Sequence, residues 1–145
     1  MSGITVGIDG SSHSTRALEW AVNEAAVRHA PLTVLTVHLV LQSGWTGNPI
    51  TFPKDAEELE KERQAAEEMT LKATSQLGEA RPASVTVRAV NGFPSQELIN
   101  ASREADLMVV GSRGAGGFAK LVAGSVSNQV VHHAHCPVVV VHSEN

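Results

Sequence analysis

Short apolar segments rich in β-branched residues alternate along this chain with longer segments that carry an apolar residue every three or four positions. The first pattern is typical of buried strands and the second of helices. We expect strands at residues 4–8, 32–41, 85–90, 107–110 and 138–141, and helices at residues 14–30, 55–77, 94–105 and 125–134. This alternation predicts an α/β fold, with a parallel sheet, right-handed crossovers and helices on both faces.

The ends of the expected helices carry recognisable signals. Ser12 or Ser14 is suited to cap the first helix, and Pro31 to stop it. Gly78 is a candidate cap for the end of the second helix. The apolar positions that we expect on the inner side of this second helix are Ala56, Leu59, Ala66, Met69, Ala73 and Leu77.

Residues 42–53 contain two glycines and two prolines and are expected to form a long loop. Trp45 and Phe52 lie in this loop. They could cover a ligand, contact a partner, or pack against their own domain, and the length of the loop favours a functional role.

Composition limits the class of protein. The chain has 145 residues, the length of one domain, and is 42% hydrophobic and 18% charged, which argues against disorder. Its formal net charge of −4 argues against broad electrostatic binding to nucleic acid. A single cysteine, no signal-peptide pattern and no apolar run near the ~20 residues that span a bilayer lead us to expect a cytoplasmic protein.

The segment after the fourth expected strand is rich in glycine, with Gly111, Gly114, Gly116 and Gly117 within a few residues. In an open parallel sheet, ligands bind beyond the carboxyl ends of the strands. Backbone N–H groups in glycine-rich turns can surround an anion, because no Cβ blocks the approach. This segment therefore predicts a phosphate site rather than a plain surface loop.

A helix is expected to begin after this loop, at Gly124 and Ser125, and a helix N-terminus attracts anions. Arg113 and Lys120 could add positive charge or remain solvated. The segment is not a Walker A loop, because no Gly-Lys-Ser/Thr ends it. It is not a dinucleotide fingerprint either, because that motif belongs after the first strand.

Asp9 ends the first expected strand. A carboxylate repels a polyphosphate unless a cation intervenes, so a functional Asp9 would contact ribose, base or water on Mg²⁺. The alternative is a turn aspartate that bonds its own backbone. The neighbouring glycine loop favours function.

These residues resemble a known family. Gly111, Gly114, Gly124 and Ser125 reproduce the G-2x-G-9x-G-(S/T) nucleotide motif of universal stress proteins. The segments VGIDGSSHSTRALEWA, ADLMVVGSRGAGGF and HCPVVVV are similar to that family's first strand and helix, fourth strand with its loop, and last strand.

The resemblance implies an open, Rossmann-like five-stranded parallel sheet of order 3-2-1-4-5 in one domain over residues 1–145. It also implies ATP as the ligand, with Mg²⁺ as a possible companion, and a homodimer paired through the last strand, Val138–Val141. An exposed apolar edge invites such pairing.

Site residues follow from the resemblance by position. Those expected on the adenosine side are Gly7, Ile8 and Asp9, with Val37 offering backbone to adenine. Those expected to hold ribose and phosphates are Gly111, Ser112, Arg113, Gly114, Ala115, Gly116, Gly117, Gly124, Ser125 and Val126.

A second group of polar residues lies near the C-terminus: His132, His133, His135, Cys136 and His142. No second ligand pair with zinc spacing accompanies them, so we interpret them as a solvated helix end and Cys136 as a small buried residue. No metal site is predicted.

Three functions are compatible with this sequence. The leading one is a nucleotide-binding regulator or sensor in the stress response, as the resemblance implies. The others are a slow ATPase and a dimeric interaction module that binds no nucleotide. Strong catalysis is not expected, because Asp9 is the one carboxylate that we can place near the loop.

Overall fold

A computed structural model of the chain describes residues 3–112 and 125–142. Its main sheet is parallel and has five strands, in the order β5-β2-β1-β6-β7. These strands are β1 (Ile4–Ile8), β2 (Pro31–Leu39), β5 (Ser84–Gly92), β6 (Leu107–Gly111) and β7 (Val138–Val141). Counted among the main strands alone, the order is 3-2-1-4-5, so the predicted α/β sheet is confirmed.

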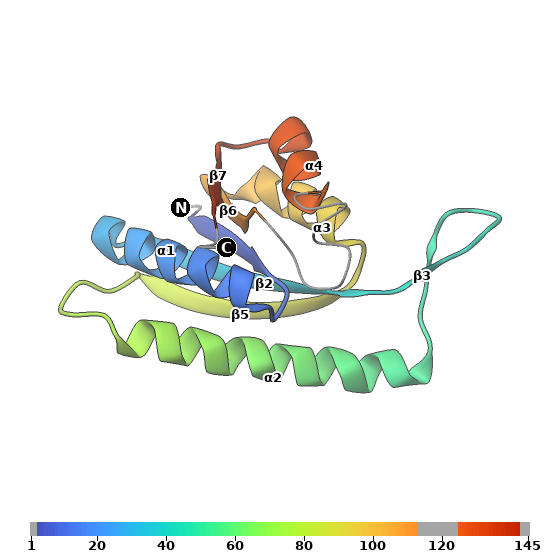
Figure 1. The fold of residues 1–145 in the computed structure, drawn as a ribbon, viewed down its shortest axis with the longest axis horizontal. Coiled ribbons are helices and arrows are strands. Elements are labelled where there is room, and N and C mark those ends of the chain that lie inside the picture. The colour runs from blue at the N-terminus through green and yellow to red at the C-terminus, as the bar shows by residue number, and fades with distance from the viewer. Residues whose placement is uncertain (1–2, 113–124, 143–145) are drawn as a thin grey trace.

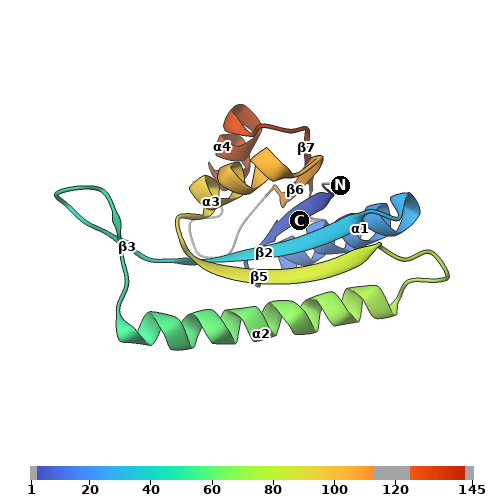
Figure 2. The same cartoon turned by 180° about the vertical axis from the view of Figure 1, so that it is seen from behind.

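Helices cover both faces of the sheet (Figures 1 and 2). The helices α1 (Ser12–Arg28) and α2 (Pro53–Ser75) lie on one face, and α3 (Pro94–Ala101) and α4 (Ser125–His133) lie on the other. One apolar layer packs α1 and α2 against the sheet, and a second layer packs α3 and α4 against it. Alternate residues of β6 enter alternate layers, as in a strand buried on both faces.

The ends of α1 differ from the sequence prediction. Ser11 caps the helix, because its Oγ accepts a hydrogen bond from the N–H of Ser14 at 3.3 Å. His29 follows the last turn in the left-handed conformation, with φ of 51°, and its N–H returns to the carbonyls of Ala25 and Ala26. Pro31 begins β2 rather than ending the helix.

Helix α2 begins earlier than expected and turns another face inward. Ala56 is exposed, which contradicts its predicted inner position, while Asp55 beside it is buried. The carboxylate takes the inner place because it bonds the N–H of Phe52 and the ring of His38. Gly78 is not the helix cap, since Gln76 follows the last turn in right-handed conformation.

The third expected helix is shorter than the apolar pattern suggested. After α3 the chain continues as a 3-10 turn, η1 (Ser102–Glu104). Ser102 is fully buried, and its Oγ donates to the carbonyl of Ile99 at 2.6 Å and accepts from the N–H of His135 at 2.9 Å. This exchange satisfies the buried hydroxyl and ties the turn to the segment before β7.

The expected loop at residues 42–53 contains a small hairpin. Its strands β3 (Leu41–Gln42) and β4 (Pro49–Ile50) pair in antiparallel fashion. Figure 1 shows residues 40–52, which we call the arm, projecting away from the sheet between β2 and α2. Trp45 is 98% exposed and Phe52 is 47% exposed, so Trp45 does not pack against its own domain.

Candidate functional site

The winding of the sheet reverses between β1 and β6. From β1 the chain moves outward through β2 to β5, and then returns to place β6 and β7 on the other side of β1. Ile8 lies beside Thr36 of β2, so Val37 is one residue beyond the end of β1 at the same edge. Gly111 ends β6 at this edge as well. The topology therefore brings Ile8, Val37 and Gly111 to the carboxyl edge, where parallel sheets bind ligands.

The loop after β1 is held by Asp9. Its Oδ1 accepts hydrogen bonds from the N–H of Ser11 at 2.9 Å and from the Oγ of Ser11 at 2.6 Å. This is the local turn that the sequence offered as the alternative to a functional role. Asp9 as a whole is exposed, directly after the end of β1.

Gly10 follows in the left-handed conformation, with φ of 82°. Only glycine adopts that region without strain. Among the described residues, no atom lies within 4 Å of a Cβ built on Gly10. The described part of the structure therefore leaves space beside this turn, next to the end of β1.

Gly7 has a structural role that the sequence did not reveal. A Cβ at this position would lie 2.7 Å from Cδ2 of Leu98. Leu98 is buried in the layer under α3, so the glycine allows this helix to approach β1 closely. The absence of a side chain at Gly7 is therefore explained by packing.

Val37 and Val126 contribute to the same apolar layer as Leu98. Both are half-buried. Ser125, the first residue of α4, is exposed, and it is followed directly by Val126.

Gly111 and Ser112 are half-buried at the end of β6. The N–H of Ser112 donates to the carbonyl of Val141 at 2.9 Å, which fixes the start of the glycine segment against β7. The remaining predicted site residues lie outside the described part of the chain: Arg113, Gly114, Ala115, Gly116, Gly117 and Gly124.

The histidines near the C-terminus lie in and after the last turn of α4. His132 and His133 are exposed, and their rings meet edge to face at a centroid distance of 6.4 Å. Burial raises the pKa of the Cys136 thiol, and the charge of Asp106 adds to this effect. A raised pKa leaves less of the nucleophilic thiolate at neutral pH.

The sequence analysis missed a different polar group. Within residues 3–112 and 125–142, the ligand atoms that lie together belong to His38, Asp55 and Glu58. In the sequence, His38 lies in an otherwise apolar strand pattern. Asp55 and Glu58 lie in a helix pattern rich in charged residues, which is typical of a solvent-exposed face. Their spacing of three residues, which places both carboxylates on one helix face, was the available signal.

The model of the universal stress protein family matches residues 1–142. The chain belongs to the universal stress protein family. A universal stress protein of Mycolicibacterium smegmatis is 34% identical over 143 residues, which cover 99% of this chain and 49% of the relative. One from Mycobacterium tuberculosis is 36% identical over 145 residues, covering 99% of this chain and 48% of the relative.

This universal stress protein chain thus spans about half the length of these curated relatives. Solved structures agree with its fold. The universal stress protein UspA of Lactobacillus plantarum superposes with a TM-score of 0.75 at 24% identity, covering 97% of both chains. A universal stress protein solved in complex with cAMP superposes with a TM-score of 0.68 at 28% identity, covering 97% of this chain and 96% of the other.

The helices of the described residues include none that combines the length and the apolar character needed to cross a membrane.

Proposed function

We propose that this universal stress protein is a regulatory protein that binds an adenine nucleotide, with ATP as its preferred ligand. The observation that carries the proposal is the placement of the motif formed by Gly111, Gly114, Gly124 and Ser125. It begins where β6 ends, beside β1, at the point where the winding of the sheet reverses. A glycine segment and a helix start at that point suit phosphate groups.

The first loop supports the same assignment from the other side of the edge. The open space beside Gly10 leaves room for a ribose or base next to Ile8. Asp9 is exposed and anchored by Ser11, which suits a fixed contact to a sugar hydroxyl or to water on Mg²⁺. The nucleotide would therefore lie between two loops, with Val37 offering backbone to the adenine.

A family relative supports the ligand class. The 28%-identical universal stress protein was solved in complex with cAMP, which is an adenine nucleotide. The choice of ATP among the adenine nucleotides rests on the resemblance of the glycine motif to that of the ATP-binding family members. Regulation is favoured over hydrolysis because Asp9 is the one carboxylate that we can place near the loop, and its Oδ1 already accepts two hydrogen bonds from Ser11.

The test begins with the purified protein. It is heat-denatured, and the supernatant is chromatographed for released nucleotide. Protein emptied of nucleotide is then titrated with ATP, ADP, AMP and cAMP, with and without Mg²⁺, by calorimetry. ATP should bind most tightly. Absence of both released nucleotide and titratable binding would contradict the proposal.

A matched pair of variants tests the motif. Gly124→Val adds a side chain where phosphate is expected, and should weaken ATP binding by about 100-fold (about 2.8 kcal/mol) or more. Gly78→Val is the control, because no atom of the residues that the structure describes lies within 4 Å of a Cβ at Gly78, which is far along the chain from the motif. Wild-type affinity in the first variant, with its fold intact by circular dichroism, would refute the assignment of the loop.

Hydrolysis is measured in the same preparation. Phosphate release beyond one turnover that is lost in Asp9→Ala would favour the slow ATPase instead of the regulator.

The protein is also proposed to form a homodimer through β7. This strand lies at the edge of the sheet and consists of four valines, Val138–Val141. Edge strands of this composition pair readily with another chain.

A further inference from the structure

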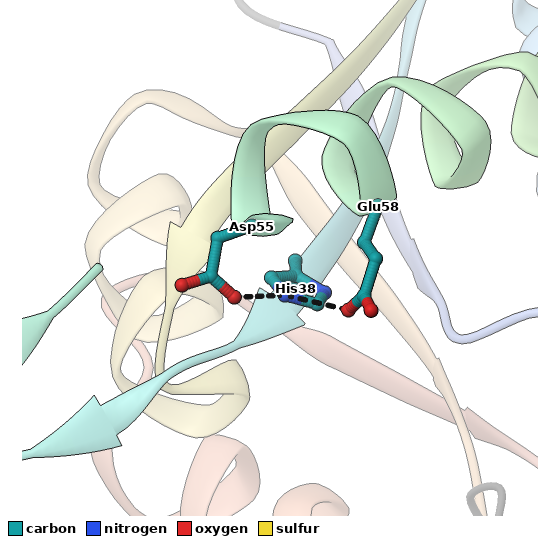
Figure 3. A group of neighbouring side chains, drawn as sticks. All are labelled: His38, Asp55 and Glu58. Carbon is teal, nitrogen blue, oxygen red and sulfur yellow. Dashed lines mark hydrogen bonds and ion pairs between the residues drawn. The ribbon is translucent and has the colours of Figure 1, made fainter. Parts of the chain in front are cut away.

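A buried histidine at the base of the arm is surrounded by carboxylates. Nε2 of His38 lies 2.8 Å from Oδ1 of Asp55 and 3.5 Å from Oε2 of Glu58, and Nδ1 lies 3.1 Å from Oε1 of Glu62. Figure 3 shows the ring of His38 between the carboxylates of Asp55 and Glu58. The side chains of His38 and Asp55 are each only 10% exposed.

The backbone holds these groups in place from two elements. His38 is the penultimate residue of β2, whereas the carboxylates stand on the first turns of α2. Asp55, Glu58 and Glu62 are spaced by three and four residues, so one helix face presents all of them to the strand. Oδ2 of Asp55 also accepts from the N–H of Phe52 at 2.6 Å, which fixes the orientation of this carboxylate.

The charges around His38 do not balance. Three carboxylates surround one imidazole, and their ion pairs among the described residues go to His38. Oε2 of Glu62 is buried and has no hydrogen-bond partner, although the rest of that side chain reaches solvent. The exposed Lys54 lies next to Asp55 along the chain. An additional positive charge at this point would therefore be stabilised.

We propose that His38, Asp55 and Glu58 form a site for a divalent transition-metal ion of the zinc class. Their donor atoms, one imidazole nitrogen and two carboxylate oxygens, lie within 4.8 Å of one another. One nitrogen and two oxygens suit Zn²⁺, which is commonly held by three protein ligands with a fourth position open to water. Mg²⁺ and Ca²⁺ prefer oxygen ligands throughout.

Glu62 would not bind the metal itself but would orient the ring of His38. A histidine that binds metal through one nitrogen usually donates the N–H of the other to a carboxylate, which fixes the ring. Nδ1 of His38 lies at hydrogen-bonding distance from Glu62, on the opposite side of the ring from Asp55 and Glu58.

The ion would close the base of the arm. Its ligands come from β2, just before residues 40–52, and from α2, just after them. A metal that joins the two ends of a loop restricts the loop and stabilises the folded chain. The arm, with Trp45 exposed on it, would then be held at a defined angle to the sheet.

The experiment uses the full chain, stripped of metal with a chelator and free of nucleotide. Zn²⁺ alone is titrated by calorimetry, and Co²⁺ is titrated by visible absorption as a report on ligand geometry. Wild-type protein should bind one Zn²⁺ per chain and gain thermal stability. His38→Gln should abolish this binding, Glu58→Gln should weaken it at least tenfold, and Glu62→Gln should weaken it about 10- to 100-fold.

Two further points separate loss of this site from zinc binding elsewhere and from misfolding of a variant. The His132→Gln/His133→Gln double variant removes the exposed histidines that could bind zinc by chance, and should bind as the wild type does. Glu58 is half-exposed and pairs with His38, so Glu58→Gln is expected to fold even if His38→Gln does not. The proposal is overturned if wild-type and Glu58→Gln proteins bind Zn²⁺ equally, or if the double variant loses the binding. Neither result depends on whether the chain binds ATP.

Discussion

At the scale of single residues, two glycines only three positions apart are required for different physical reasons. Gly7 lies in a strand and admits the side chain of Leu98, whereas Gly10 lies in a turn and supplies a positive φ. The resemblance to the family gave Gly7 a place in the ligand site. The structure shows that packing alone is a sufficient reason for a glycine at this position.

We expect Gly7→Ala to destabilise the protein by about 1–3 kcal/mol, the usual cost of overpacking a core. The new Cβ would meet Cδ2 of Leu98 at 2.7 Å, and that buried side chain has little freedom to move. Urea denaturation measures the change in the free energy of unfolding.

A double-mutant cycle with Leu98→Ala tests the cause of this loss. If the contact explains it, Gly7→Ala should cost much less in the Leu98→Ala background. Equal costs in both backgrounds would show that the loss has another origin.

At the scale of elements, the helix ends depend on hydrogen bonds that the sequence leaves ambiguous. The sequence predicts Ser12 or Ser14 as the cap of α1, although Ser11 has the same residue type. The structure selects Ser11, because its backbone is extended and its Oγ faces the N–H of Ser14. The same serine anchors Asp9, so the helix start and the loop after β1 form one unit.

Ser11→Ala should lower the free energy of unfolding by about 1 kcal/mol, through loss of the cap. Ser12→Ala, in the exposed first turn, is the matched control and should change it little. Thermal unfolding followed by circular dichroism compares the two. A larger loss of stability in Ser12→Ala than in Ser11→Ala would contradict the assignment of Ser11 as the cap.

At the scale of the whole molecule, the two ends of the sheet face different surroundings. Both β5 and β7 are edge strands; the long helix α2 runs along β5, whereas β7 lies at the opposite edge, away from α2. The carbonyls of Pro137 and Val141 accept from the N–H groups of Met108, in β6, and Ser112, which follows β6. Because strand groups alternate, the N–H of Val140 points to the free edge.

Val140→Pro should therefore abolish the proposed dimer and leave the β6 ladder intact. Proline removes the outward N–H and is tolerated on edge strands. Val140→Ile keeps the N–H and should remain dimeric. Sedimentation velocity gives the oligomeric state, and a monomeric wild-type protein would rule out pairing through β7.

The sequence by itself determined the order of strands and helices and, through the family resemblance, the order 3-2-1-4-5 of the sheet. These features are carried by local periodicity and by a motif in continuous sequence, which need no knowledge of distant contacts. The motif also located the candidate nucleotide site, of which Ile8, Val37 and Gly111 lie at one edge of the sheet.

Only the tertiary structure decided which residues meet across the chain. The packing of Leu98 on Gly7 and the enclosure of His38 by Asp55, Glu58 and Glu62 join segments that are far apart in sequence. A histidine in an apolar strand and acids on a charged helix look unrelated until the fold brings them together. Their chemistry arises from burial and proximity, which periodicity does not record.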